Sequence, residues 1–174
     1  MRILLCFVLS LLFITPTLAD ELRHSVIVKK AERKLHLYTN GKLEKTYAIA
    51  LGTTPVGHKM KQGDRKTPEG TYYICRKNPR SQFYLSLGLS YPNKLDADSG
   101  YASGLITKRE RDKIKRAIDR GDCPPWDTAI GGEIFIHGNG STPDWTWGCV
   151  ALDDTMIKEL YDLLPVGTEV RIEP

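Results

Sequence analysis

The chain has 174 residues, of which 41% are hydrophobic and 26% are charged, a composition typical of a globular protein and not of a disordered one. Twenty-five Lys and Arg residues against 21 Asp and Glu residues give a formal charge of +4. This excess is too small to indicate a nucleic-acid partner, and the sequence contains no basic arm. The length suits one domain with a single core.

The first 19 residues have the pattern of an export signal. Arg2 precedes an apolar run from 3 to 14, and small residues at Thr17 and Ala19 form a cleavage site. The run is shorter than the roughly 20 residues that span a bilayer, although an uncleaved anchor is the alternative. We therefore expect a signal peptide at 1–19, a single mature domain at 20–174 with no membrane span, and a location in the periplasm or cell wall.

Removal of this signal changes the cysteine count. Cys6 leaves with it, and Cys75, Cys123 and Cys149 remain in an oxidising compartment. An odd number leaves at least one thiol free or paired between molecules. Spacing does not fix the pairing, because a disulfide depends on geometry that the sequence does not contain. If Cys75 and Cys123 pair, Cys149 is the free thiol.

Strand patterns occupy most of the mature chain. Apolar and polar residues alternate in segments 25–30 and 34–38, and a further strand is expected at 43–51. Asn40-Gly41 predicts a hairpin before the third strand, because both residues tolerate the positive φ of a type I′ turn. The segment 52–67 reads as a loop. Further strands are expected at 71–76, 84–89, 133–137 and 169–172.

Two segments have helical periodicity. In 108–120 the residues Ile114, Ala117 and Ile118 share one face, and Gly121 suits the C-terminal cap. The second helix begins at Asp153 or Asp154 and ends before Pro165. Together these segments predict a mainly β protein with two helices, a β-rich α+β fold.

One histidine and one cysteine are placed for chemistry. His137-Gly138 ends an apolar strand, and Gly148-Cys149 precedes the second helix. A neighbouring imidazole and a nearby helix start both favour the nucleophilic thiolate. Glycine before the cysteine lets a carbonyl approach backbone N–H groups that stabilise an oxyanion. The alternatives are a buried, inert cysteine and a metal site, which would need two further ligands at spacings that are absent here.

At these residues the sequence resembles a known family. Ile-His-Gly at 136–138 followed by Gly-Cys-Val at 148–150 is similar to the active-site signature of the YkuD-type L,D-transpeptidases. The Asn-Gly hairpin, Lys-Thr-Pro-Glu-Gly at 66–70 and Gly-Thr-Glu-Val at 167–170 fit in the same order. The resemblance implies a YkuD-like mixed β-sandwich with the cysteine between a strand and a helix, and a reaction that needs no metal or organic cofactor.

The resemblance also implies roles for individual residues. Cys149 is the nucleophile, His137 is the general base, and the Gly138 backbone orients the imidazole. The backbone of Gly148 and Cys149 forms the oxyanion hole. The implied substrates are peptidoglycan stem peptides, whose third residue is acylated onto the thiol with loss of D-alanine. The acyl group then passes to an amine or to water, with a wall-attached protein as one acceptor or substrate.

The sequence departs from the family pattern at three positions. Thr146 stands where Ser is usual, Trp147 replaces a polar residue, and Ala151 replaces an Arg that supplies charge beside the nucleophile. This form resembles a YafK-like branch, which is also linked to hydrolytic removal of proteins from peptidoglycan. Thr146, Trp147 and Tyr91 are candidates for substrate binding, although Tyr91 also suits a plain turn. The loop between His137 and Cys149 is short, so a lid is expected from 82–99.

We therefore expect a cysteine acyltransferase that cross-links or remodels the cell wall. One alternative is a hydrolase of the same family, an L,D-carboxypeptidase or an amidase that releases protein from peptidoglycan. A second alternative is a non-catalytic domain that binds the cell wall.

Overall fold

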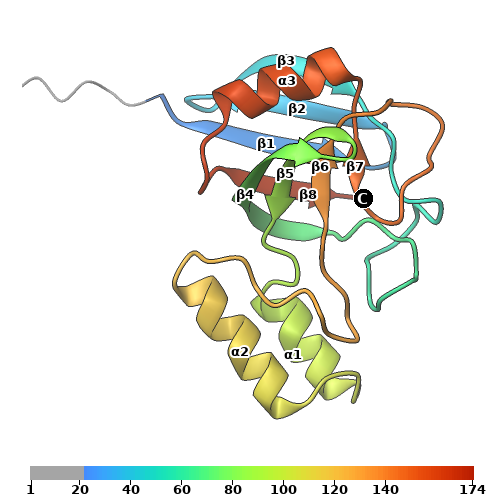
Figure 1. Cartoon of the computed structure of the whole chain (residues 1–174), viewed down its shortest axis with the longest axis vertical. Coiled ribbons are helices and arrows are strands. Elements are labelled where there is room, and N and C mark those ends of the chain that lie inside the picture. Colours follow the sequence, from blue (N-terminus) through green and yellow to red (C-terminus); the bar gives the residue numbers. More distant parts are fainter. Residues whose placement is uncertain (1–21) are drawn as a thin grey trace, which may run out of the picture.

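The computed structural model describes residues 22–174, so the predicted signal peptide and Cys6 lie outside the described residues. Eight strands form one mixed sheet in the order β3-β2-β1-β8-β4-β5-β6-β7 (Figure 1). Neighbours are antiparallel except β1 with β8 and β6 with β7. The strands are β1 (His24–Lys29), β2 (Lys34–Thr39), β3 (Lys42–Ala48), β4 (Gly70–Ser81), β5 (Tyr84–Leu89), β6 (Phe135–His137), β7 (Val150–Ala151) and β8 (Glu169–Glu173).

The main core follows from the alternation of apolar residues along these strands. Val26 of β1 lies opposite Val170 of β8, and Val28 lies opposite Ile172, with all four side chains buried. Two apolar rows on adjacent parallel strands therefore face the same interior. The predicted mainly β fold class is confirmed. Asn40 and Gly41 both have positive φ, 51° and 77°, as the predicted hairpin requires.

Three helices are present, one more than the sequence indicated: α1 (Lys94–Ala102), α2 (Lys108–Asp119) and α3 (Asp154–Leu163). The prediction missed α1 because the residues that it buries are Asp96, Ala97 and Gly100, which are polar or small and produce no apolar periodicity. Its start was nevertheless encoded. Asn93 caps the helix, and the Asp96 carboxylate accepts from the Asn93 backbone N–H at 2.8 Å.

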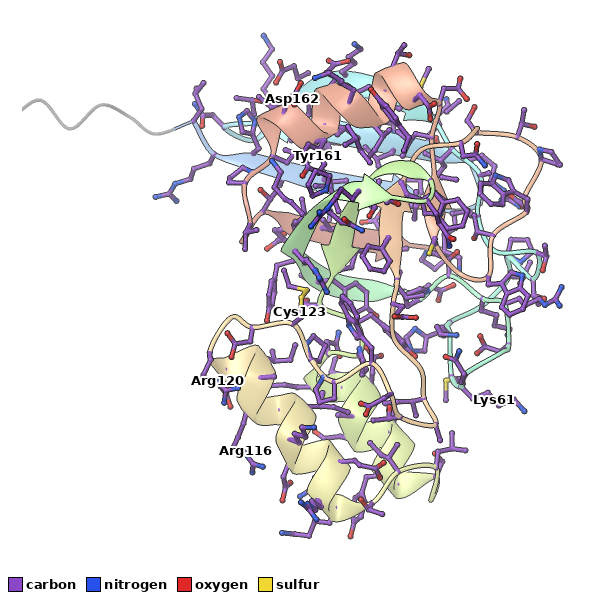
Figure 2. All side chains as sticks on the ribbon, in the orientation of Figure 1. Lys61, Arg116, Arg120, Cys123, Tyr161 and Asp162 are labelled. Carbon is purple, nitrogen blue, oxygen red and sulfur yellow. A yellow bond between two sulfur atoms is a disulfide. The ribbon has the colours of Figure 1, made fainter. Side chains whose placement is uncertain are left out.

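The helices lie at opposite ends of the molecule. The α1–α2 hairpin is at one end, and α3 is at the other (Figure 1). The hairpin has a small core of its own, in which Ala97, Ile106, Ile114 and Ile130 are buried. The opposite face of α2 is charged, and Arg116 and Arg120 extend from it into solvent (Figure 2). No helix in residues 22–174 is long and apolar enough to cross a membrane.

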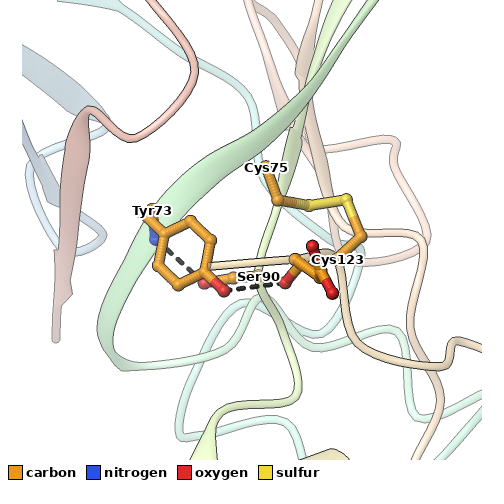
Figure 3. Close-up of a disulfide and its surroundings, with 5 residues drawn as sticks. Tyr73, Cys75, Ser90 and Cys123 are labelled. Carbon is orange, nitrogen blue, oxygen red and sulfur yellow. Dashed lines mark hydrogen bonds between the residues drawn. A yellow bond between two sulfur atoms is a disulfide. The ribbon is translucent and has the colours of Figure 1, made fainter. Parts of the chain in front are cut away.

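A disulfide joins Cys75 of β4 to Cys123 in the loop after α2 (Figure 3). Beside it the Tyr73 hydroxyl donates to the carbonyl oxygen of Asp122 at 2.7 Å, and the Tyr73 N–H donates to Ser90 Oγ at 2.9 Å. The pairing that the sequence left open is therefore Cys75 with Cys123. Within residues 22–174, Cys149 is the free cysteine.

Candidate active site

The parallel pair β6 and β7 brings His137 and Cys149 to the same part of the sheet. His137 is the last residue of β6 and lies opposite Ala151, while Cys149 immediately precedes β7. Ala151 also exchanges backbone hydrogen bonds of 2.9 Å with Ala50. The short strand that follows Cys149 is therefore held on both edges.

The loop from 138 to 149 is bonded to the turn between β1 and β2 and to the chain that follows β3. Asp144 accepts three hydrogen bonds of 2.7–3.1 Å from the Arg33 guanidinium and one of 2.9 Å from the Leu51 N–H. The Thr146 N–H donates to the Leu51 carbonyl oxygen at 3.1 Å. A bidentate guanidinium contact combined with backbone bonds fixes both position and direction. The loop that leads to Cys149 is therefore fixed in position by these hydrogen bonds.

Thr146 organises the backbone next to Cys149. Its hydroxyl accepts from the Gly148 N–H at 3.1 Å and donates to the Cys149 carbonyl oxygen at 2.8 Å. Gly148 has φ 128°, and a Cβ there would lie 2.7 Å from the carbonyl oxygen of Lys66. Both the positive φ and the close approach require glycine.

This arrangement corrects the predicted oxyanion hole. The Gly148 N–H is occupied by Thr146, so it does not face an incoming carbonyl. Among residues 22–174, no acceptor is bonded to the Cys149 N–H. Of the two predicted backbone donors, the structure leaves that of Cys149 free.

His137 is held in one orientation. Its Nδ1 lies 2.7 Å from the carbonyl oxygen of Gly138. A carbonyl only accepts hydrogen bonds, so Nδ1 carries the proton and Nε2 of the neutral ring is free to accept one. The Phe83 ring stacks on the imidazole with centroids 4.6 Å apart, and Trp145 packs edge-on at 5.5 Å. Burial lowers the pKa of His137, outweighing the opposing effect of the bond to Gly138.

The Gly138 backbone can orient the imidazole because it is itself fixed. Its N–H donates to the Phe83 carbonyl oxygen at 3.1 Å. A Cβ at this position would collide with the Asp154 carboxylate and would lie 2.9 Å from that same Phe83 oxygen. The contact to His137 therefore depends on a glycine at position 138.

The surroundings of the Cys149 thiol favour its protonated form. Its Sγ accepts from the Phe135 N–H at 3.4 Å and donates to the Glu133 carbonyl oxygen at 3.6 Å. Burial raises the pKa of Cys149 to about 11, although the Phe135 N–H and Lys59 act in the opposite direction. Within residues 22–174 no hydrogen bond joins Sγ to His137.

Neither feature that the sequence offered in favour of a thiolate, a helix start and an imidazole, makes a hydrogen bond to Sγ among residues 22–174. β7 separates Cys149 from α3, so the nucleophile does not sit at the start of that helix. In place of a helix dipole and an imidazolium, the thiol has a carbonyl acceptor that stabilises the neutral S–H form.

His137 and Cys149 line one cavity of about 380 Å³. Tyr91, Thr146 and Trp147, which the sequence suggested for substrate binding, are absent from its wall. Segment 82–99, expected to supply a lid, contributes three wall residues, and its later part forms core and α1. The wall consists of Asn78, Ser81, Gln82, Phe83, Ser86, Glu133, Phe135, His137 and Cys149.

Tyr91 and Trp147 lie elsewhere for clear physical reasons. Tyr91 is buried in the core, where its ring packs edge-on against Tyr72 and its hydroxyl donates to the Ile130 carbonyl oxygen at 2.9 Å. Trp147 is 70% exposed, and the Arg65 guanidinium lies 5.0 Å from its ring centroid. Tyr91 also precedes a bend at Pro92, so it is a core aromatic at the edge of a turn.

Sequence reasoning missed several wall residues, of which Phe83, Ser86 and Glu133 are the most informative. Ser86 had a signal: it is a polar residue within the apolar strand β5, directly opposite His137. Phe83 sits in the turn between β4 and β5, where no periodicity identifies it. Within residues 22–174 no group of three or more His, Cys, Asp or Glu side chains is placed to hold a metal.

A sequence model of the YkuD L,D-transpeptidase catalytic domain matches residues 23–172. The chain belongs to this family. Protein YafK of Escherichia coli (strain K12), named as an L,D-transpeptidase, is 36% identical over 78 residues, which are 41% of this chain and 32% of YafK.

Solved structures with the same fold cover most of this chain. Pgp2 of Campylobacter jejuni, described as a helical cell shape determining protein, matches with a TM-score of 0.57 at 25% identity over 88% of this chain and 48% of Pgp2. Bd1075 of Bdellovibrio bacteriovorus matches with a TM-score of 0.55 at 27% identity over 87% of this chain and 48% of that chain. The chain therefore spans about half the length of these two solved chains and about a third of the length of YafK.

Proposed function

We propose that the chain is an exported cysteine acyltransferase that acts on peptidoglycan stem peptides through an acyl-enzyme on Cys149. One observation carries the proposal: a free thiol and an imidazole with its Nε2 unprotonated line the same cavity. Membership of the L,D-transpeptidase family supports this substrate class. Relatives that include a cell shape determining protein support a site of action at the wall, and thus export in a form without residues 1–19.

The geometry supports a sequence of proton transfers. Substrate entry breaks the bond from Sγ–H to the Glu133 carbonyl oxygen, and the thiol proton passes to Nε2 of His137. The sulfur attacks the carbonyl carbon of the third stem residue, and the Cys149 N–H donates to the oxygen that gains charge. The C–N bond then breaks, and the leaving amine takes the proton from His137. An acceptor amine or water attacks the thioester, and its proton returns through His137 to the sulfur.

Hydrolysis by the same acyl-enzyme is the second candidate. Ala151, which stands where the resemblance implies an Arg, is uncharged and fully buried, and its N–H and carbonyl oxygen both bond to Ala50, so it offers no charge to hold a donor carboxylate. The 36% identity to YafK over 78 residues supports this alternative, which rests on the resemblance to the YafK-like branch. In this case water accepts the acyl group, and the products are shortened stems or released wall-attached protein.

The deciding experiment incubates the protein with purified muropeptides and reads the products by mass spectrometry. New cross-links indicate transfer, whereas shortened or released products indicate hydrolysis. Cys149→Ala should abolish both, and a mass increase on Cys149 should mark the acyl-enzyme. Full turnover by Cys149→Ala would refute the mechanism. Wall binding without turnover by the unaltered protein would identify a binding domain.

A further inference from the structure

The cavity beside Cys149 is acidic. Of its nine wall residues one bears a carboxylate, Glu133, and none is Lys or Arg. Glu133 is exposed, and among residues 22–174 no basic side chain forms an ion pair with it. The free energy of an incoming group at this wall therefore depends on its charge, and a cation is favoured over an anion.

Lys59 and Arg65 do not compensate this charge. Lys59 acts on the thiol through space, but it is buried and bonded to Asp64 at 2.9 Å. Arg65 lies over the ring of Trp147, outside the cavity wall. Ala151 occupies the position at which the family carries an Arg. The cavity wall thus contains one acidic residue, Glu133, and no Lys or Arg that could bind a carboxylate.

Glu133 is held close to the nucleophile. Its carbonyl oxygen accepts from Cys149 Sγ, and it adopts φ 54°, a left-handed conformation that is uncommon for a residue with a side chain. The preceding Gly132 packs so closely on Trp126 that a Cβ would overlap that ring. Such backbone strain is found mainly at functional sites, where the surrounding packing maintains it. The segment therefore holds the Glu133 carbonyl oxygen beside Sγ, and the Glu133 carboxylate acts on the thiol through space.

We propose that Glu133 forms an ammonium subsite, which binds the free primary ammonium group on the side chain of the third stem-peptide residue. This inference rests on the proposed function, since it assigns the position of a substrate group relative to Cys149. A single ion pair of this exposure is worth about 1 kcal/mol at most, so we expect a preference of about fivefold for the charged side chain. Glu133 is a specificity-determining residue here and takes no part in proton transfer.

The test compares two synthetic tetrapeptides, L-Ala-γ-D-Glu-L-Lys-D-Ala and the same peptide acetylated on the lysine Nε. Binding is measured by NMR titration with Cys149→Ala, which cannot be acylated. The free-amine peptide should bind about fivefold more tightly. In Cys149→Ala/Glu133→Gln the two affinities should become equal. Glu169→Gln, which removes an exposed carboxylate of β8 outside the cavity, is the matched control and should keep the preference.

Equal affinities with Glu133 in place, an unchanged preference in Glu133→Gln, or binding of neither peptide would overturn the inference. Thermal unfolding checks that Glu133→Gln is folded, and Gln suits the same backbone conformation as Glu. A second arm measures acylation with Cys149 present. One outcome separates the two proposals. If neither peptide acylates Cys149, but Cys149→Ala binds the free-amine peptide more tightly and Glu133→Gln removes this preference, the proposed function fails and the ammonium subsite stands.

Discussion

His137 donates from Nδ1 to the carbonyl oxygen of Gly138 at 2.7 Å, so the proton of the neutral imidazole is on the nitrogen that faces the protein. The other nitrogen is then the base. Burial lowers the pKa of this ring and raises that of Cys149 to about 11, and both changes favour a neutral pair over a thiolate and an imidazolium.

The rate of alkylation of Cys149 should report this neutral pair. Because the thiolate is the reactive species, the rate with iodoacetamide should rise about tenfold per pH unit from pH 7 to pH 10. At pH 7 the rate should be far below that of a free cysteine. The measurement is the mass of modified protein against time in a pH series. A plateau that begins below pH 8 would contradict the raised thiol pKa.

Thr146 should matter through both of its hydrogen bonds. Thr146→Val keeps the shape but removes the acceptor for the Gly148 N–H and the donor to the Cys149 carbonyl oxygen. Leaving these buried groups without partners should cost about 1–3 kcal/mol of transition-state stabilisation. This corresponds to a roughly 5- to 150-fold fall in kcat/KM on stem peptides.

Thr146→Ser is the matched control, because it retains the hydroxyl. We expect it to keep most of the activity, in line with the serine that the family carries here. Equal losses in the two variants would show that the methyl group, and not the hydroxyl, supports the loop.

The Lys59–Asp64 pair should contribute to stability, because the Lys59 side chain is buried and the Asp64 side chain is only 9% exposed. Asp64→Asn leaves an unpaired buried cation and should lower the free energy of unfolding by about 3 kcal/mol. Urea denaturation at pH 7 gives this value. Asp162→Asn, which breaks an exposed pair with Lys158, is the control and should change it by less than about 0.5 kcal/mol.

The same pair predicts a pH dependence. Burial alone would raise the pKa of Asp64, but hydrogen bonds from Lys59 and from three backbone N–H groups together lower it. A carboxylate with a lowered pKa stabilises the fold above its unfolded value, which is about 3.9, and this contribution is lost as the pH falls through the folded value. The difference between wild type and Asp64→Asn should therefore be constant from pH 5 to pH 7 and shrink below pH 4.

The Cys75–Cys123 disulfide should stabilise the fold without taking part in catalysis. It closes a loop with a sequence separation of 48, for which chain entropy predicts a loss of about 4 kcal/mol when the double variant Cys75→Ser/Cys123→Ser replaces it. Denaturation curves measure the loss. At a temperature where the variant remains folded, its Cys149 alkylation profile should match that of the wild type.

Much of the fold was predictable because burial follows periodicity. Val26 and Val28 occupy alternate positions on one face of β1 and are buried, and the Asn40-Gly41 turn has the backbone that its residues favour. Helix α1 was not predictable in this way. Its core-facing residues include Ala97 and Gly100, which pack closely because they are small. Ile130 fills the space beside Gly100.

The candidate site was also predictable only in part. The Cys149 and His137 pair was accessible because its residue types carry specific chemistry at the ends of predicted elements. The cavity wall was not, because Phe83 and Glu133 reach it from a turn and from a strained segment whose paths depend on tertiary contacts. Tyr91 shows the opposite case. The sequence suggested a substrate-binding residue or a plain turn, whereas the ring is buried in the core and its hydroxyl donates to the Ile130 carbonyl oxygen.

The raised pKa of the Cys149 thiol has a consequence for the survival of this cysteine in an oxidising compartment, where the proposed function places the protein. The chain needs Cys75 and Cys123 oxidised while Cys149 stays reduced, and a thiolate would threaten both conditions. Thiolates attack disulfides and are the form that peroxides oxidise. A protonated Cys149 resists disulfide exchange and sulfenic acid formation, because both reactions proceed through the thiolate. The desolvation that raises the pKa of Cys149 therefore also protects the nucleophile that the proposed mechanism uses.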